Sequence, residues 1–199
     1  MLTFLFDINI MLITDDHLVI FLNYDINKML KRGDKLNRYK IGMYGGKFMP
    51  FHKGHNYCID FACSECDKVF VILFHGGSDE LNILKYSRSH YLSVNDRKIH
   101  LFNICKKYKN AVPVLIDVSN CKLENGEEDW DAETPLVRNV VGNRLDAVYS
   151  SEVSYDEYFK RAYPEAVHRI VDYKRIKYPI SGTDIRKMKN IKEREKWIV

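Results

Sequence analysis

Residues 44–58, "YGGKFMPFHKGHNYC", decide the fold. They follow a short apolar stretch and lead into a segment whose apolar residues recur at helical spacing. Gly45 and Gly46 let the backbone turn sharply and bring N–H groups close to a ligand, because no Cβ stands in the way. His52 and His55 lie where the next helix is expected to begin. Because a helix N-terminus has free N–H groups and a positive dipole end, this loop predicts a phosphate-binding site.

Other interpretations of the loop are less convincing. Taken singly, His52 and His55 would be ordinary surface side chains of a turn, but Lys47 adds a formal positive charge beside them. The two histidines have no third ligand at suitable spacing, so no metal held by the protein is expected. The GxxxxGK[ST] pattern of a Walker A loop is missing.

Outward from the loop, strands and helices alternate along the chain. Strands are expected at 39–44, 68–74, 111–118, 145–150 and 166–171, and helices at 55–66, 96–107, 134–142, 155–162 and from 182 onward. The span 78–94 is irregular and polar, which predicts a mobile loop near the site. The alternation favours an α/β fold with a doubly wound parallel sheet. In such sheets the ligand crevice lies beyond the carboxyl ends of the strands, where the strand order switches.

A second candidate element is "YPISGTDIRK", residues 178–187. Ser181 or Thr183 is placed to cap the helix that follows, which is a structural role. Arg186 lies one turn into that helix, where its guanidinium can meet an anion held at the same end. If the sheet brings both helix N-termini together, they hold one polyphosphate from two sides.

Composition limits the classes of function. The chain has 199 residues, 46% of them hydrophobic, and a net charge of +4. That charge suits an anionic small molecule and is too small for a typical nucleic-acid surface. The odd count of five cysteines, without framework spacing, favours reduced thiols in a cytoplasmic protein.

Residues 1–38 are interpreted as an N-terminal extension of unknown role, and residues 39–199 as the main domain. Asp7, Asp15 and Asp16 interrupt the apolar N-terminal stretch, so no spanning helix is expected. A basic region and a cleavage site are also missing, which argues against a signal peptide.

The two motifs resemble a known family. "GKFMPFHKGH" (46–55) is similar to the GxFxPxHxGH signature of the HIGH-type nucleotidyltransferase superfamily, and "ISGTDIR" (180–186) to its ISxTxxR signature. Within that superfamily the chain most resembles the NMN adenylyltransferase domain of NadR-type bifunctional bacterial proteins. The resemblance covers roughly residues 39–190. Supporting stretches are "VNDRKIHLF" (94–102), "EEDWDAE" (127–133) and "VYSSE" (148–152).

This resemblance implies a Rossmann-like nucleotidyltransferase fold and transfer of AMP from ATP to nicotinamide mononucleotide (NMN), giving NAD and pyrophosphate. It implies a Mg²⁺ ion that arrives with ATP. The catalytic residues it implies are Lys47, His52, His55 and Arg186. The ATP-binding residues it implies are Gly46, Phe48, His52, His55, Ser150, Ser181, Thr183 and Arg186. The NMN-binding residues it implies are Gly46, Phe48, Trp130 and Arg97. Trp130 would stack on the nicotinamide ring, although it is also interpretable as a loop anchor, and Arg97 as part of a surface pair at a helix start.

Several alternatives stay open. Some relatives have an aspartate where this chain has Met49, so no role of that carboxylate is expected here. Another acceptor, such as phosphopantetheine or a cytidylyl acceptor, is possible, and so is a nucleotide sensor without turnover. A fragment of a class I aminoacyl-tRNA synthetase and a nucleic-acid module are less favoured, since "KMKN" (187–190) directly follows ISGTDIR and the tail has mixed charge. Partners other than ATP and a pyridine mononucleotide are not expected, except a second copy of the chain.

Overall fold

The computed structural model describes residues 37–87 and 92–199 of the protein. In this part of the chain five strands form one sheet: β1 (Tyr39–Gly46), β2 (Cys66–His75), β3 (Ala111–Asp117), β4 (Ala147–Ser150) and β5 (Val167–Ile170). Their order across the sheet is β3-β2-β1-β4-β5, and all four neighbouring pairs are parallel. The expected doubly wound parallel sheet is confirmed.

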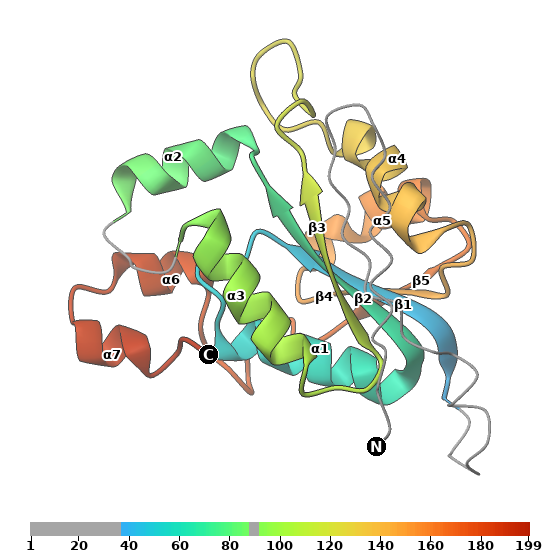
Figure 1. The fold of residues 1–199 in the computed structure, drawn as a ribbon, viewed down its shortest axis with the longest axis horizontal. Helices are drawn as coiled ribbons and strands as arrows, with labels where there is room; N and C mark the ends of the chain where they lie inside the picture. The colour runs from blue at the N-terminus through green and yellow to red at the C-terminus, as the bar shows by residue number, and fades with distance from the viewer. Residues whose placement is uncertain (1–36, 88–91) are drawn as a thin grey trace, which may run out of the picture.

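Helices cover both faces of the sheet (Figure 1). They are α1 (Lys53–Glu65), α2 (Ser78–Tyr86), α3 (Val94–Cys105), α4 (Trp130–Val141), α5 (Asp156–Ala162), α6 (Gly182–Lys187) and α7 (Ile191–Glu195), with a short 3-10 helix, η2 (Val153–Tyr155), before α5. β2 is a continuous apolar run, as expected of a strand buried on both faces. Its side chains alternate between two cores. Val69, Val71 and Leu73 pack with α1 and α3, whereas Phe70 and Ile72 pack with α4.

The topology places the switch in strand order at β1. The chain leaves β1 towards β2 and β3 on one side and later returns to place β4 and β5 on the other. In a parallel sheet, loops at such a point diverge and leave a crevice beyond the carboxyl ends of the strands. The loop after Gly46 and the loop after Ser150 therefore border the same crevice.

Two expectations need correction. Residues 78–86 are not an irregular loop but helix α2, whose first turn carries Asp79 and Glu80. Helix α4 begins at Trp130 rather than near 134, because the Asp129 side chain accepts hydrogen bonds from the N–H groups of Asp131 and Ala132. The expected N-terminal extension lies, apart from residues 37 and 38, outside the described residues. Within the described ranges, no helix is both long and apolar enough to cross a bilayer.

Candidate functional site

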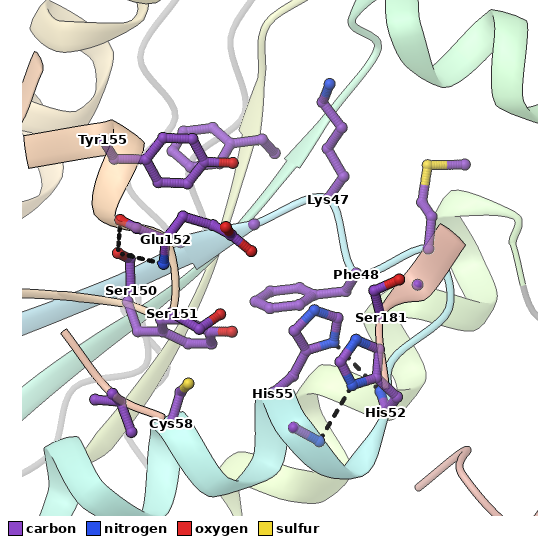
Figure 2. Close-up of a pocket in the computed structure, with 18 of the residues that line it drawn as sticks. Lys47, Phe48, His52, His55, Cys58, Ser150, Ser151, Glu152, Tyr155 and Ser181 are labelled. Atoms are coloured by element: carbon purple, nitrogen blue, oxygen red, sulfur yellow. Dashed lines mark hydrogen bonds between the residues drawn. The ribbon is translucent and has the colours of Figure 1, made fainter. Parts of the chain in front are cut away.

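A cavity of about 470 Å³ opens at the carboxyl ends of β1 and β4. All but one of the expected site residues line it: Gly46, Lys47, Phe48, His52, His55, Trp130, Ser150, Ser181, Thr183 and Arg186. They come from four separate stretches of the chain, 46–55, 130, 150 and 181–186, which the fold brings together. In Figure 2 the His52 and His55 rings lie close to Ser181, while Ser150, Glu152 and Tyr155 form another part of the wall.

The loop after β1 forms one wall of the cavity because its backbone is tightly constrained. A Cβ on Gly45 would lie 2.6 Å from the Phe74 ring, so only glycine fits there. Phe48 adopts a positive φ of 50° and is nearly fully buried. Its ring lies 4.5 Å from that of Phe51 and 5.0 Å from that of His55, centroid to centroid. The apolar packing thus holds the loop and the second histidine in place.

The two histidines cap helix α1 and each other. Nδ1 of His52 accepts a hydrogen bond from the Gly54 N–H at 3.1 Å, and Nδ1 of His55 accepts one from the His52 N–H at 3.3 Å. These two contacts form a reciprocal capping box. Because both Nδ1 atoms are acceptors, the ring proton of each neutral histidine is on Nε2. Each ring therefore has one N–H left that can donate to an anion in the cavity.

Burial keeps both histidines neutral. Burial, together with the smaller effect of the positive charge of Arg175, lowers the pKa of His52 to about 4. Burial also lowers the pKa of His55 well below its usual value, with His52 and Arg175 acting in the same direction. At neutral pH the pair therefore offers hydrogen-bond donors without positive charge, and the charge in the cavity must come from lysine and arginine.

Arg186 joins the second motif to the first. From α6, its Nη1 donates to the Met49 carbonyl at 2.5 Å, and its Nη2 donates to the Thr183 hydroxyl at 2.9 Å. Ser181 caps α6 by accepting a hydrogen bond from the Asp184 N–H at 3.1 Å. Gly182 lies so close to the first loop that a Cβ there would be 3.1 Å from the Met49 oxygen. The two motifs, which are more than a hundred residues apart in the chain, thus form one continuous wall.

Lys47 is held by carboxylates. Its Nζ lies 2.7 Å from Oε1 of Glu128 and 3.1 Å from Oδ2 of Asp79. Burial alone would lower the pKa of Lys47, but the hydrogen bonds to Glu128 and Asp79 outweigh it and raise that pKa. Burial raises the pKa of the cavity-lining Glu133 to about 7, and the neighbouring Glu128 carboxylate contributes to that rise. The lysine is charged, and an anion that binds it must compete with two carboxylates.

Trp130 lies at the acidic side of the cavity as the first residue of α4. Its ring packs edge-on against Tyr155 and Tyr158, with centroids 5.2 Å and 5.3 Å away. The side chain is still 39% exposed. The indole is therefore both anchored by its neighbours and accessible to a planar ligand, so the anchoring and stacking interpretations are compatible.

Arg97 is the expected site residue that does not line the cavity. It is fully buried on α3 and forms an ion pair with Glu80 of α2. Its Nη1 donates to the Lys47 carbonyl at 2.7 Å. In this position Arg97 supports the backbone of the loop after β1 and does not face the cavity.

Sequence reasoning missed several residues of the wall, of which Arg175 is the most informative. It lines the cavity, with a φ of 51°, and donates to the Ile180 carbonyl at 2.6 Å and to the Glu152 carboxylate at 2.5 Å. Glu133 and Tyr155 were also missed. Arg175 lies in the stretch just before ISGTDIR, so its charge was visible, but nothing in the sequence indicated which way it faces.

No protein-family model matches the chain. The trifunctional NAD biosynthesis/regulator protein NadR of Escherichia coli is 32% identical over 152 residues, which are 73% of this chain and 36% of that protein. The chain thus spans little more than a third of the length of that relative. The phosphopantetheine adenylyltransferase of Mycoplasma capricolum is 28% identical over 156 residues, which are 77% of this chain and 99% of that protein.

Solved structures share the fold. A crystal structure of a NadR protein in complex with NAD and AMP-PNP matches 83% of this chain and 46% of its own, with a TM-score of 0.59 and 23% identity. A bifunctional NMN adenylyltransferase/ADP ribose pyrophosphatase from Francisella tularensis matches 75% of this chain and 41% of its own, with a TM-score of 0.52 and 21% identity.

Proposed function

We propose that this chain, which is related to the NadR-type proteins and has a Rossmann-like nucleotidyltransferase fold, transfers AMP from ATP to NMN. The products are NAD and pyrophosphate. The observation that carries the proposal is the meeting of the two motifs in one cavity, where Arg186 of the second motif donates to the Met49 carbonyl of the first. Trp130 on the wall of the same cavity supports a planar acceptor.

In this proposal the chain's residues hold the triphosphate and stabilise the leaving group. The Nε2–H groups of His52 and His55 donate to phosphate oxygens, and Arg186 and Lys47 supply positive charge. The 5′-phosphate oxygen of NMN attacks the α-phosphorus, the bond from that phosphorus to the bridging oxygen breaks, and pyrophosphate leaves with the electron pair. Such a transfer depends on positioning and on charge neutralisation, so no covalent intermediate and no general base are needed.

Mg²⁺ enters this proposed reaction as part of the substrate, bound to the phosphates of ATP. The divalent cation neutralises phosphate charge during the transfer. The protein then contributes the cations of Lys47 and Arg186 around the same phosphates. Lys47 reaches them only if the incoming phosphate replaces Asp79 or Glu128 as its partner, since both carboxylates hold it in this structure.

At the acceptor end, Trp130 stacks on the nicotinamide ring. A flat cationic ring is attracted to the face of an indole. Glu128 lines the same cavity and becomes a free negative charge there once a phosphate takes Lys47 from it, and Glu133, with a pKa of about 7, ionises more readily beside a cation. The acidic surroundings and the exposed indole together favour a pyridinium nucleotide as the acceptor.

A second candidate acceptor is phosphopantetheine, because the Mycoplasma capricolum relative aligns over nearly its whole length. The experiment that separates the two is pyrophosphate release by the purified chain with ATP and Mg²⁺, in parallel with NMN, nicotinic acid mononucleotide, phosphopantetheine and no acceptor. We expect release with NMN, with NAD formed in equal amount. Release with phosphopantetheine alone would replace the proposal with the second candidate, and ATP binding without release would identify a nucleotide sensor.

A further inference from the structure

The chain after α7 runs back to the start of α1, where the loop after β1 ends (Figure 1). The Lys53 N–H donates to the Trp197 carbonyl at 2.9 Å, and His52 and Ile198 form an isolated antiparallel bridge. Trp197, Ile198 and Val199 are half-buried, and none of them lines the cavity. Residues 197–199, named here the return segment, therefore touch the loop through their backbone and stay outside the site itself.

Two further contacts hold the return segment in place. Val199 packs against the core formed by the sheet, α1 and α3. Its main-chain oxygen lies 2.6 Å from Nδ1 of His100 on α3. Before α7, Arg186 already ties the chain to the Met49 carbonyl. The chain is thus anchored to the loop after β1 and the start of α1 at two places, one before α7 and one after it.

The contact with Trp197 occupies one of the backbone donors at the start of α1. A helix leaves its first N–H groups without partners inside the helix, and such groups commonly bind anions. Here the His52 N–H goes to Nδ1 of His55, the Gly54 N–H to Nδ1 of His52 and the Lys53 N–H to Trp197. These three donors all have partners within the chain. An anion at this end of the cavity therefore meets the imidazole Nε2–H groups instead.

The position of both imidazoles depends on the backbone of His52. This residue is extended, with φ −140° and ψ 169°, and Lys53 after it is the first residue of the helix. Nδ1 of His55 accepts the His52 N–H, and the two rings stack 3.6 Å apart. A movement of the His52 backbone therefore moves both rings. The bridge to Ile198 and the hydrogen bond to Trp197 fix this backbone from outside the helix.

We propose that the return segment is a positioning element for the phosphate donors. The Trp197 carbonyl and the bridge at Ile198 hold the backbone of His52 and Lys53, so that both histidine rings keep their Nε2–H groups directed into the cavity. The proposal rests on the proposed function insofar as it takes the phosphates of ATP to be the ligand of those groups. The segment does not contribute to the wall around Trp130, so the acceptor end of the cavity does not depend on it.

The body of α1 is held without the return segment, because Ile59 and Ala62 are fully buried in the core. A substitution in the first turn can therefore release the segment and leave the helix intact. Proline at Lys53 suits this purpose, since proline lacks the N–H and is favoured at the first position of a helix. It also favours an extended residue before it, and His52 is already extended.

The test compares Lys53→Pro with Lys53→Ala. Both variants lack the exposed lysine side chain, and only the proline variant lacks the donor to Trp197. Calorimetry measures the binding of α,β-methylene-ATP and of NMN, so the readout does not require turnover. We expect Lys53→Pro to bind the ATP analogue about tenfold more weakly than Lys53→Ala, the effect of about one hydrogen bond, and to bind NMN equally well. Equal binding of the analogue by the two variants, or an equal loss for both ligands, would overturn the proposal.

Removal of residues 197–199 shows whether the proline acts through the segment. In the shortened chain, Lys53→Ala should bind the ATP analogue about tenfold more weakly than it does in the parent chain. Lys53→Pro should then cause no further loss. A further tenfold loss would mean that the proline disturbs the loop directly, which would contradict the role of the segment.

Nuclear magnetic resonance observes the positions directly. Hydrogen exchange of the Lys53 N–H should be slow in the parent chain and fast in the shortened one, and fast exchange in both would refute the contact. The ATP analogue should shift the Nε2 resonances of His52 and His55 in Lys53→Ala, and shift them less in Lys53→Pro. Analogue binding that differs between the two variants, without any formation of NAD, would refute only the proposed reaction. Formation of NAD with equal binding by both variants would refute only the positioning role.

Discussion

The imidazole rings of His52 and His55 are stacked, with centroids 3.6 Å apart and planes inclined by 26°. Each ring accepts a backbone N–H through Nδ1, so both can direct an Nε2–H into the cavity. Burial is the main reason why both rings stay neutral, and the neighbouring His52 lowers the pKa of His55 further. The pair therefore forms a donor site of two N–H groups at the start of α1.

The first prediction concerns this donor site. In His52→Asn the amide oxygen keeps the cap on the Gly54 N–H, but the Nε2–H donor is lost. We expect kcat/KM to fall by about 10²-fold, the usual effect of removing one preorganised donor. Steady-state kinetics with ATP and NMN measure it, and circular dichroism checks that the helix is kept. Turnover near that of the parent chain would remove His52 from the phosphate site.

The second prediction concerns Arg186. Arg186→Ala removes the guanidinium that contacts both Met49 and Thr183, so the two motifs lose a link and the cavity loses a charge. We expect kcat/KM to fall by about 10²-fold or more. The matched control is Lys187→Ala, on the exposed side of the same helix, which we expect to leave the rate unchanged. Equal effects of the two variants would indicate that net charge alone matters.

The third prediction concerns Trp130. Stacking of a ring on an aromatic side chain contributes about 1–3 kcal/mol, so Trp130→Ala should raise KM for NMN about tenfold or more. KM for ATP should change little. Trp130→Phe keeps an aromatic face and should recover most of the affinity. A selective loss of ATP affinity in Trp130→Ala would assign the indole to the nucleotide end of the cavity.

The fourth prediction concerns pH. His52 has a pKa of about 4 in the folded chain against 6.5 for an ordinary histidine, so the unfolded chain binds the proton more readily. The stability that this difference contributes is present above pH 6.5 and is lost as the pH falls through 4. A shift of this size corresponds to about 3 kcal/mol.

Urea unfolding at a series of pH values measures this effect. The free energy of unfolding of the parent chain should fall more steeply between pH 7 and 4 than that of His52→Asn, by an amount on the order of 3 kcal/mol. Parallel curves for the two proteins would show that His52 titrates normally.

The part of the site that could be predicted lies within short stretches of sequence. Gly45, His52 and Arg186 stand in motifs whose local chemistry already indicates phosphate binding. The alternation of strands and helices predicted the parallel sheet and a crevice at the carboxyl ends of its strands, but the meeting of the two motifs there was only a condition of the prediction. Helix α2 was not predicted because its sequence lacks the continuous apolar face of a packed helix. In the structure the side chains of Leu81 and Leu84 are 64% and 40% exposed, which agrees with the absence of such a face.

The contacts that hold α2 in place could not be predicted from the sequence of the helix itself. Glu80 pairs with Arg97 of α3 and accepts the Gly76 N–H at 2.9 Å. The sequence showed that Arg97 opens a helix, but only the fold shows that a carboxylate from another helix lies against it. The interpretation of Arg97 as a ligand contact came from the resemblance. Its ion-pair partner, Glu80, could not be predicted from the sequence. A hydrogen bond between Ser150 and His168 is of the same kind, since it joins two neighbouring strands.

The measurement that tests the central claim most directly follows the α-phosphate. The purified chain is incubated with Mg²⁺, NMN and ATP that carries a radioactive label in the α-phosphate, and the products are separated. The account predicts labelled NAD and unlabelled pyrophosphate in equal amounts, with both lost in the Arg186→Ala variant and kept in Lys187→Ala. Binding of ATP and NMN without transfer of the label to NAD would contradict it.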